Sequence, residues 1–237
     1  MLPQTLMSNI VEKTRDYWSN EVKESYFIEM AKGKEVGHKM ADLVDEKTDA
    51  LLTLYHQTKH QHNSQGSQRA RSMGDLWLKG ENIYHPVNIK TGVVGSEGQP
   101  NLVSLRKVLL GILERRIDSY YLLMVKMQIP KDSSSIKPSV IFTDMLDWLD
   151  YVTFDAGPGQ MMLKANAFFE NYDPEKEPHL TISEKVSHLF DLYEDGVRRL
   201  NVNRENTLQS IRESVDNFHN QKDWAVTPLT QQELLLR

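Results

Sequence analysis

The most regular pattern of hydrophobic and polar positions in this chain lies in Gly74–Thr91, which reads GDLWLKGENIYHPVNIKT. Leu76 and Leu78 alternate with Asp75 and Trp77, and this two-residue period is typical of a strand with one buried face. We therefore predict a short strand whose two leucines point to one side and whose Asp75 and Trp77 point to the other.

A turn and a second strand are predicted to follow. The segment Lys79–Asn82 is polar and contains a glycine, which suits the connection of a hairpin. The second strand is expected to begin at Ile83 and to end at Ile89 or Lys90, with a loop that starts at Thr91-Gly92.

Helical periodicity dominates both ends of the chain. Apolar residues recur at spacings of three and four through residues 1–58, which predicts amphipathic helices with a break at Lys32-Gly33-Lys34. The helix after this break covers about Glu35–Gln57. The C-terminal part shows the same spacing and predicts two separate helices, Ile182–Leu200 and Glu205–Phe218.

Between the hairpin and the C-terminal helices, the pattern predicts a further helix and a buried strand. Asn101 is placed to cap a helix that runs from Leu102 to about Arg116. Ser119–Met127 (SYYLLMVKM) is almost continuously apolar over the length of a strand, as in a central strand buried on both faces. Ser139–Phe142 and Trp148–Phe154 favour further strands, or a strand and a short helix.

The order of elements is therefore helix, hairpin, helix and buried strand. It predicts an α/β (α+β) fold with a mixed central sheet flanked by helices. The 237 residues fit a single domain. Within it we distinguish N-terminal helices (1–58), a core (59–170) and a C-terminal helical region (171–237).

Composition limits the cellular locations and the partners that we expect for the protein. The chain is 39% hydrophobic and 26% charged, no apolar run reaches the roughly 20 residues of a membrane span, and the first residues lack a secretory pattern. With no cysteine, disulfides and thiolate zinc sites are excluded. We therefore expect a cytoplasmic protein without a membrane segment. The net charge of −5 argues mildly against nucleic acid, unless positive charge is gathered on one surface.

The hairpin also brings chemically useful side chains together. Pairing of its two strands places Asp75, at the start of the first, near Asn88 and Lys90, at the end of the second. A carboxylate, a neutral oxygen ligand and a lysine at one end of a hairpin suit a hard metal ion and an activated water.

In this combination the chain resembles the PD-(D/E)xK nucleases, a superfamily that includes many type II restriction endonucleases. The matching residues are Asp75 on one strand and Asn88-Ile89-Lys90 on the next, inside an α-β-β-α-β order. Two positions depart from the family pattern: Gly74 stands in place of the proline, and Asn88 in place of the second carboxylate.

The resemblance implies a restriction-endonuclease-like core that hydrolyses phosphodiester bonds of double-stranded DNA with Mg²⁺, at specific sites and as a homodimer. Asp75, the backbone carbonyl of Ile89 and Asn88 would hold the metal, and Lys90 would act on the water. An acid of the preceding helix, Glu46 or Glu35, would complete the ligand set. The alternative for these two glutamates is an ordinary solvated helix face.

Candidate DNA contacts lie on both sides of the hairpin. The very polar segment Lys59–Ser72 contains Gln68, Arg69 and Arg71, and arginine and glutamine bind both base edges and phosphates. The alternative for this segment is an exposed loop without a function. Gln99 and Asn101, at the end of a glycine-rich loop, are the other candidates.

Two other classes of function stay open at the level of sequence. One is a DNA-binding protein on a nuclease-like fold whose catalysis was lost with the Asn88 position. The other is a helical protein-interaction module in which the hairpin is purely structural. The GxxxxGK[ST], GxSxG and HExxH motifs do not occur, which argues against nucleotide hydrolases, esterases and zincins.

Overall fold

A computed structural model describes residues 1–21, 47, 50, 73–80, 83–93, 99–127 and 138–220. The helix predicted for Glu35–Gln57 and the polar segment Lys59–Ser72 fall almost wholly outside these residues. Contacts divide the chain into two units, Met1–Gly196 and Val197–Arg237.

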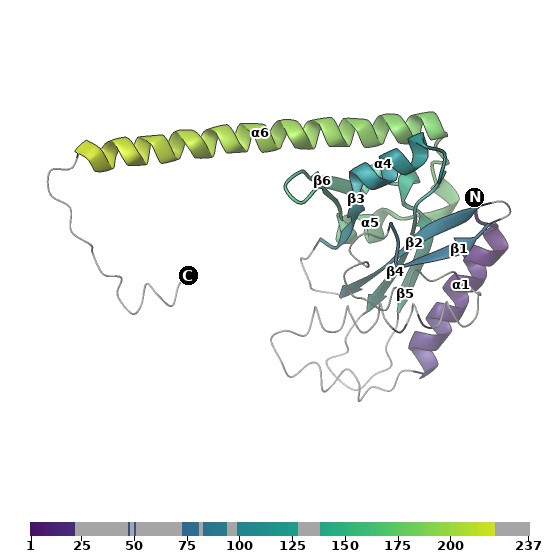
Figure 1. The fold of residues 1–237 in the computed structure, drawn as a ribbon. Coiled ribbons are helices and arrows are strands. Elements are labelled where there is room, and N and C mark those ends of the chain that lie inside the picture. Colours follow the sequence, from purple (N-terminus) through teal and green to yellow (C-terminus); the bar gives the residue numbers. More distant parts are fainter. Residues whose placement is uncertain are drawn as a thin grey trace. The chain divides into compact units, whose positions relative to one another are not determined.

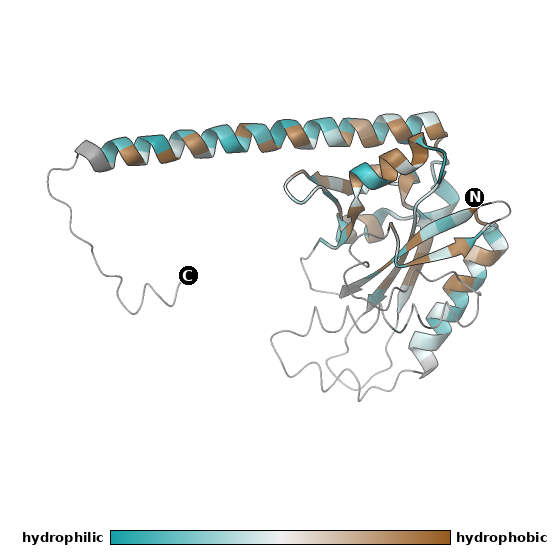
Figure 2. Cartoon of the chain, viewed as in Figure 1, coloured by the Kyte–Doolittle hydropathy of each residue, from teal (hydrophilic) through white to brown (hydrophobic). Residues whose placement is uncertain are grey.

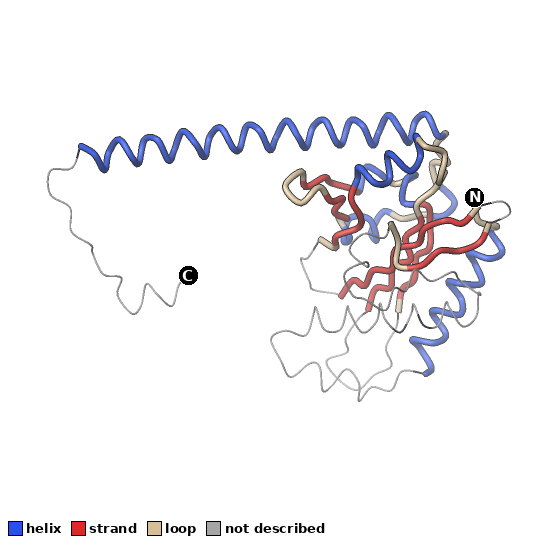
Figure 3. The backbone as a smooth tube through the Cα atoms, viewed as in Figure 1, coloured by secondary structure: helices blue, strands red, loops and turns tan. Residues whose placement is uncertain are grey.

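The centre of the first unit is a four-stranded sheet in the order β1-β2-β4-β5. The strands are β1 (Leu76–Lys79), β2 (Tyr84–Val93), β4 (Tyr121–Met127) and β5 (Ser139–Asp144). β1 and β2 are antiparallel, β2 and β4 parallel, and β4 and β5 antiparallel, so the sheet is mixed (Figures 1 and 3). The prediction of a mixed sheet with helices is confirmed.

The predicted hairpin is present, with Leu76 opposite Val87 and Lys79 opposite Tyr84. Its second strand is longer than predicted, because it ends at Val93 and not near Lys90. The extra residues pair with the central strand β4, up to Val93 opposite Met127. A neighbouring strand supplies hydrogen-bond partners that the local sequence of Thr91-Gly92 does not reveal.

One face of this sheet packs against α1 (Gln4–Asp16) (Figure 1). Leu76 and Leu78 are fully buried in this layer, as their alternation predicted. After α1 the chain continues into a π-helical turn, Tyr17–Glu21, which carries the buried Trp18. Residues of α1, β1, β2, β4 and β5 form one hydrophobic core cluster, and hydrophobic segments occur on α1 and on the strands in Figure 2.

α4 (Leu105–Leu113) lies between β2 and β4 in the chain and buries Val108 and Ile112. It begins later than predicted, because residues Asn101–Ser104 form strand β3. The role of Asn101 as a helix cap is therefore wrong: Asn101 pairs with Met162, and Ser104 precedes the helix. Pairing with a strand distant in the chain determines that this segment is a strand and not a helix. No local sequence pattern predicts this pairing.

β3 belongs to a second sheet, in the order β3-β7-β6, with β6 at Val152–Asp155 and β7 at Gln160–Leu163. The short helices η3 (Met145–Asp147) and η4 (Leu149–Tyr151) connect the two sheets. α5 (Ala165–Asn171) and η5 (Pro174–Lys176) follow β7.

The last described element is α6 (Ile182–Asn220), a single helix where the sequence predicted two. The predicted break, Asn201–Arg204, contains neither glycine nor proline, and residues of low helix propensity cost only a few tenths of a kcal/mol each. Within the first unit, α6 buries Leu189 and passes Phe154 at Gly196, where a Cβ would clash with the Phe154 ring.

Candidate functional site

Asp75 lies at the start of β1 and is bound to β2 on both sides of Asn88. Its backbone N–H donates to the carbonyl of Val87 (2.8 Å), and its carboxylate Oδ2 accepts from the N–H of Ile89 (2.7 Å). Asp75 is exposed, whereas Asn88 is 5% exposed. The predicted meeting of Asp75 with the Asn88–Ile89 segment is present in the structure.

The close approach of the chain before Asp75 requires a glycine. A Cβ at Gly74 would lie 2.7 Å from Val87 O and 2.9 Å from Val87 N, and both are backbone atoms that cannot move aside cheaply. A proline or any other side chain at this position would displace Asp75 from Ile89. The close contact with Val87 therefore explains why a glycine, and not a proline, stands at position 74.

Ile89 lies beyond the last paired residue of β1, because the register of β1 with β2 begins at Leu76 opposite Val87. In a strand, the N–H and C=O groups of one residue point to the same side. Since the N–H of Ile89 reaches the carboxylate of Asp75, its carbonyl is directed toward the same edge. A carboxylate and a backbone carbonyl are both oxygen ligands of the kind that hard cations prefer.

Asn88 has one satisfied and one unsatisfied polar atom. Its Nδ2 donates to the carbonyl of Leu102 at 3.4 Å, which turns Oδ1 away from that carbonyl. Oδ1 is buried and has no hydrogen-bond partner among the described residues. A buried acceptor without a partner costs about 1–3 kcal/mol, so its retention calls for an explanation.

Two more unsatisfied atoms lie on the same face of the sheet, namely Trp77 Nε1 and Tyr120 Oη. Side chains alternate along a strand, so Asp75 and Trp77 share the face opposite to the buried Leu76 and Leu78. Asn88 lies opposite Leu122 in the parallel pair, and Tyr120 is two residues before Leu122, which places Tyr120 on this face as well.

We name Trp77 Nε1, Asn88 Oδ1 and Tyr120 Oη the unpaired patch. It holds three of the four buried side-chain polar atoms without a partner among the described residues, and the fourth is Thr14 Oγ1 on α1. Burial raises the pKa of Tyr120 well above its usual value, and the charge of Asp75 raises it further, while the side-chain amide of Asn88, which lies within hydrogen-bonding reach of the phenol, lowers it. The phenol therefore stays protonated.

Lys90 lies two residues beyond Asn88 on β2 and so points to the same face. It is partly exposed, and no ion pair within 4.0 Å joins it to Asp75 in the described part of the chain. An ammonium group beside the unpaired patch, not neutralised by Asp75, is available to a negatively charged ligand.

The residues at this edge suit a divalent cation in part. Asp75 offers a charged oxygen, Ile89 a carbonyl, and Asn88 a buried oxygen for which the described part of the chain provides no hydrogen-bond partner. Asp75 is the single carboxylate among them, and the described ranges contain no group of three His, Cys, Asp or Glu side chains able to hold a metal. The glutamates that were expected to add a ligand, Glu35 and Glu46, lie outside the described residues.

The predicted DNA contacts are not brought together at the hairpin. Gln68, Arg69 and Arg71 lie outside the described residues. Gln99 and Asn101 are both exposed: Asn101 is the first residue of β3 in the second sheet, and Gln99, two residues before it, accepts with Oε1 from Thr153 Oγ1 at 3.5 Å. Their role in DNA binding stays a prediction.

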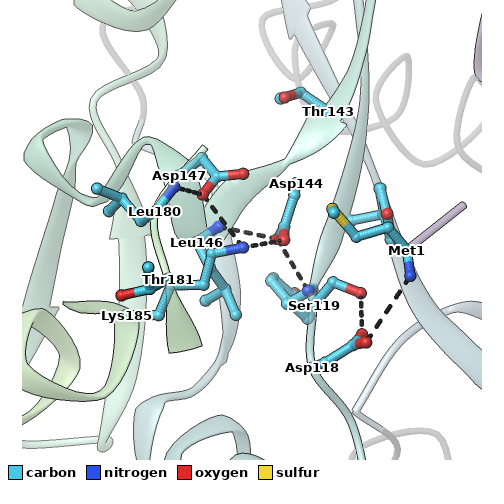
Figure 4. A network of polar contacts seen from close by, with 12 residues as sticks. Met1, Asp118, Ser119, Thr143, Asp144, Leu146, Asp147, Leu180, Thr181 and Lys185 are labelled. Atoms are coloured by element: carbon cyan, nitrogen blue, oxygen red, sulfur yellow. Dashed lines mark hydrogen bonds and ion pairs between the residues drawn. The ribbon is translucent and has the colours of Figure 1, made fainter. Parts of the chain in front are cut away.

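Asp144, Asp147 and Lys185 form a buried charged network, which no pattern in the sequence predicts (Figure 4). Lys185 Nζ lies 2.7 Å from Asp144 Oδ2 and 3.1 Å from Asp147 Oδ1, and all three residues are at most 5% exposed. Asp144 Oδ1 accepts from the backbone N–H groups of Tyr120 (3.0 Å) and Leu146 (3.1 Å). The network therefore fixes the backbone of Tyr120.

Burial and ion pairing shift the pKa values of Asp144 and Lys185 in opposite directions. Burial raises the pKa of Asp144, and Lys185 lowers it without cancelling the effect. Burial alone would lower the pKa of Lys185, but the two carboxylates raise it above its usual value. The three groups are each other's partners, so we interpret this cluster as a structural anchor.

A cavity of about 320 Å³ lies elsewhere in the first unit, between the start of α6 and the η4–β6 segment. Its polar lining includes Asp150, Lys164, His188 and Asp191. Lys164 Nζ donates to the backbone carbonyl of Asp150. None of the hairpin residues lines this cavity.

Neither family models nor curated proteins give a match to this sequence. Among the described residues, no helix is long and apolar enough to cross a membrane. The case for a function therefore depends on the geometry of the hairpin.

Replacing Asn88 by Asp is expected to destabilise the metal-free protein. One carboxylate oxygen would face the carbonyl of Leu102 in place of Nδ2, without a hydrogen and almost fully buried. We expect a loss of at least about 2 kcal/mol in the free energy of unfolding at pH 7, measured by urea denaturation. Asn101→Asp, at an exposed position, is the matched control and should change little. Equal stability of the two variants would show that Asn88 Nδ2 is not needed.

Proposed function

We propose that this protein is a metal-dependent nuclease that hydrolyses phosphodiester bonds of double-stranded DNA, on a core like that of the restriction endonucleases. One observation carries the proposal: the carboxylate of Asp75 and the backbone of Ile89 meet beside the start of β1, next to a buried oxygen of Asn88 that has no hydrogen-bond partner among the described residues. The order of α1, the hairpin, α4 and the parallel strand β4 supports it.

Each residue of the hairpin end has a separate task in this proposal. Asp75, the Ile89 carbonyl and Asn88 Oδ1 would hold a cation such as Mg²⁺. When bound, such a cation polarises a phosphate and lowers the pKa of a bound water. Lys90 would orient the attacking water and stabilise negative charge that develops on the phosphate.

A non-catalytic DNA-binding protein is the second candidate. Its support is the single carboxylate at the hairpin end among the described residues, since a neutral Asn88 binds a hard cation more weakly than an acid would. It differs from the nuclease in one respect only: it binds DNA and leaves it intact.

A homodimer is the assembly that a two-fold DNA site would favour. In the unit Val197–Arg237, α6 exposes the large apolar residues Val202, Leu208, Ile211 and Val215, each 45–55% exposed. The spacing from Leu208 to Val215 is three and then four residues, as in a two-helix seam. A monomeric mass in light scattering, both free and with DNA, would contradict the dimer.

Incubation with a long duplex of mixed sequence separates these candidates. With Mg²⁺ or Mn²⁺ the nuclease is expected to give discrete fragments, and with EDTA none. Retarded but intact DNA at every metal concentration would favour the binding protein. If the DNA is neither cut nor retarded, the hairpin is structural and the protein-interaction module is the better account.

A further inference from the structure

The hydroxyl of Tyr120 is fully buried and has no hydrogen-bond partner among the described residues. The neighbouring Tyr121, on the opposite face of the sheet, shows the usual arrangement: it is 2% exposed, and its hydroxyl accepts from the N–H of Leu2 at 2.8 Å. The Tyr121 hydroxyl thus has a backbone partner at hydrogen-bond distance, whereas the Tyr120 hydroxyl has only the side-chain amide of Asn88 within reach among the described residues.

Hydrogen bonds to both of its backbone polar groups fix the position of Tyr120. Its N–H donates to Asp144 Oδ1 (3.0 Å), its carbonyl accepts from the N–H of Met145 (2.8 Å), and Lys185 holds Asp144. Because its ring is fully buried, the side chain cannot turn its hydroxyl to solvent. The hydroxyl is therefore held in place beside Asn88 before any ligand arrives.

The unpaired patch has the hydrogen-bonding capacity that a bound water needs. Trp77 Nε1 donates only, Asn88 Oδ1 accepts only, and the Tyr120 hydroxyl does both. A buried water makes two to four hydrogen bonds to such groups. The Tyr120 hydroxyl can therefore bind a water that reaches this face of the sheet.

We propose that Tyr120 is a positioning residue of the metal site: its hydroxyl binds a water that a divalent cation holds at Asp75. Tyr120 does not touch the metal, and it acts by orienting this water. This inference depends on the proposed function, because it presumes that a cation binds at the hairpin end.

The test is Tyr120→Phe, which removes the hydroxyl and keeps the ring, with Tyr121→Phe as the matched control. Calorimetric titration of the full chain with Mn²⁺ is expected to show about tenfold weaker binding for Tyr120→Phe, as for other residues that orient ligands from the second layer. Tyr121→Phe should bind Mn²⁺ like the parent. Without metal, Tyr120→Phe should melt at the parental temperature or above it, and Tyr121→Phe below it, because only the latter loses a hydrogen bond.

Each other outcome decides against the inference. If Tyr120→Phe binds Mn²⁺ like the parent while Asp75→Asn does not bind, the inference fails and the metal site stands. If the parent itself does not bind Mn²⁺, or Asp75→Asn binds it unchanged, the proposed function fails too. If Tyr120→Phe does not fold, the hydroxyl has a partner in the metal-free protein, and the inference is wrong.

Discussion

Asp75→Asn is expected to reduce Mg²⁺-dependent DNA cleavage at least about a hundredfold and to leave the fold intact. The amide oxygen still accepts from the N–H of Ile89, so the variant removes charge and little else. A metal ion contributes several kcal/mol to stabilising the transition state, and each 1.4 kcal/mol is about tenfold in rate. The measurement is the single-turnover cleavage rate at saturating enzyme.

DNA binding should respond to Asp75→Asn in the opposite way. One negative charge near the phosphates is lost, so affinity in a gel shift with Ca²⁺ should be equal or higher. Asp150→Asn is the matched control, since it makes the same change at an exposed carboxylate outside the hairpin. Parental cleavage by Asp75→Asn would exclude the hairpin as the active site.

Lys185→Met is expected to lower the free energy of unfolding by about 3–5 kcal/mol at pH 7. The change leaves Asp144 and Asp147 buried without their cation, and breaking a buried ion pair by removing one partner has a cost of this size. Since Asp144 holds the backbone of Tyr120, we also expect weaker metal binding in this variant. Urea denaturation measures the first effect.

A surface pair provides the control for this prediction. Lys176 Nζ lies 2.7 Å from Asp173 Oδ2, the same distance as in the buried pair, but Lys176 is 80% exposed. Lys176→Met should leave stability unchanged, because water screens an exposed pair. Equal losses in the two variants would show that the Asp144 network does not stabilise the fold.

The pH dependence of Lys185→Met gives a second check. Burial already raises the pKa of Asp144, and loss of the ammonium raises it further. A carboxyl group whose pKa is higher in the folded than in the unfolded state loses folding stability as the pH rises through that interval. The deficit of the variant relative to the parent is therefore expected to be smaller near pH 4 than near pH 8.

The parts of the fold that the sequence predicted are those with a local period. The alternation around Leu76 identified β1 and its buried side, and the apolar run Ser119–Met127 identified the central strand β4. The spacing of apolar residues near Ile10 identified α1. In each case, the pattern of apolar residues over a short segment is enough to predict whether one face of the element or both faces are buried.

The other parts depend on partners far apart in the chain. Asn101 resembles a helix cap by itself, and only its pairing with Met162 makes it part of a strand. Lys185 meets Asp144 across 41 residues, and neither stands out in the sequence. Tyr120 belongs to an apolar run that is typical of a core, so the special setting of its hydroxyl becomes visible only when the structure places Asn88 near it.

Mapping the bound metal tests the central claim most directly. Fe²⁺ replaces Mg²⁺, and ascorbate with peroxide then produces hydroxyl radicals that cut or oxidise the chain next to the ion, as peptide mass spectrometry can locate. With the full chain and DNA, we expect modification at Asp75 and at Asn88–Lys90, suppressed by excess Mg²⁺ and lost in Asp75→Asn. Modification confined to the Asp150–Asp191 cavity, or unchanged in Asp75→Asn, would contradict a metal centre at the end of this hairpin.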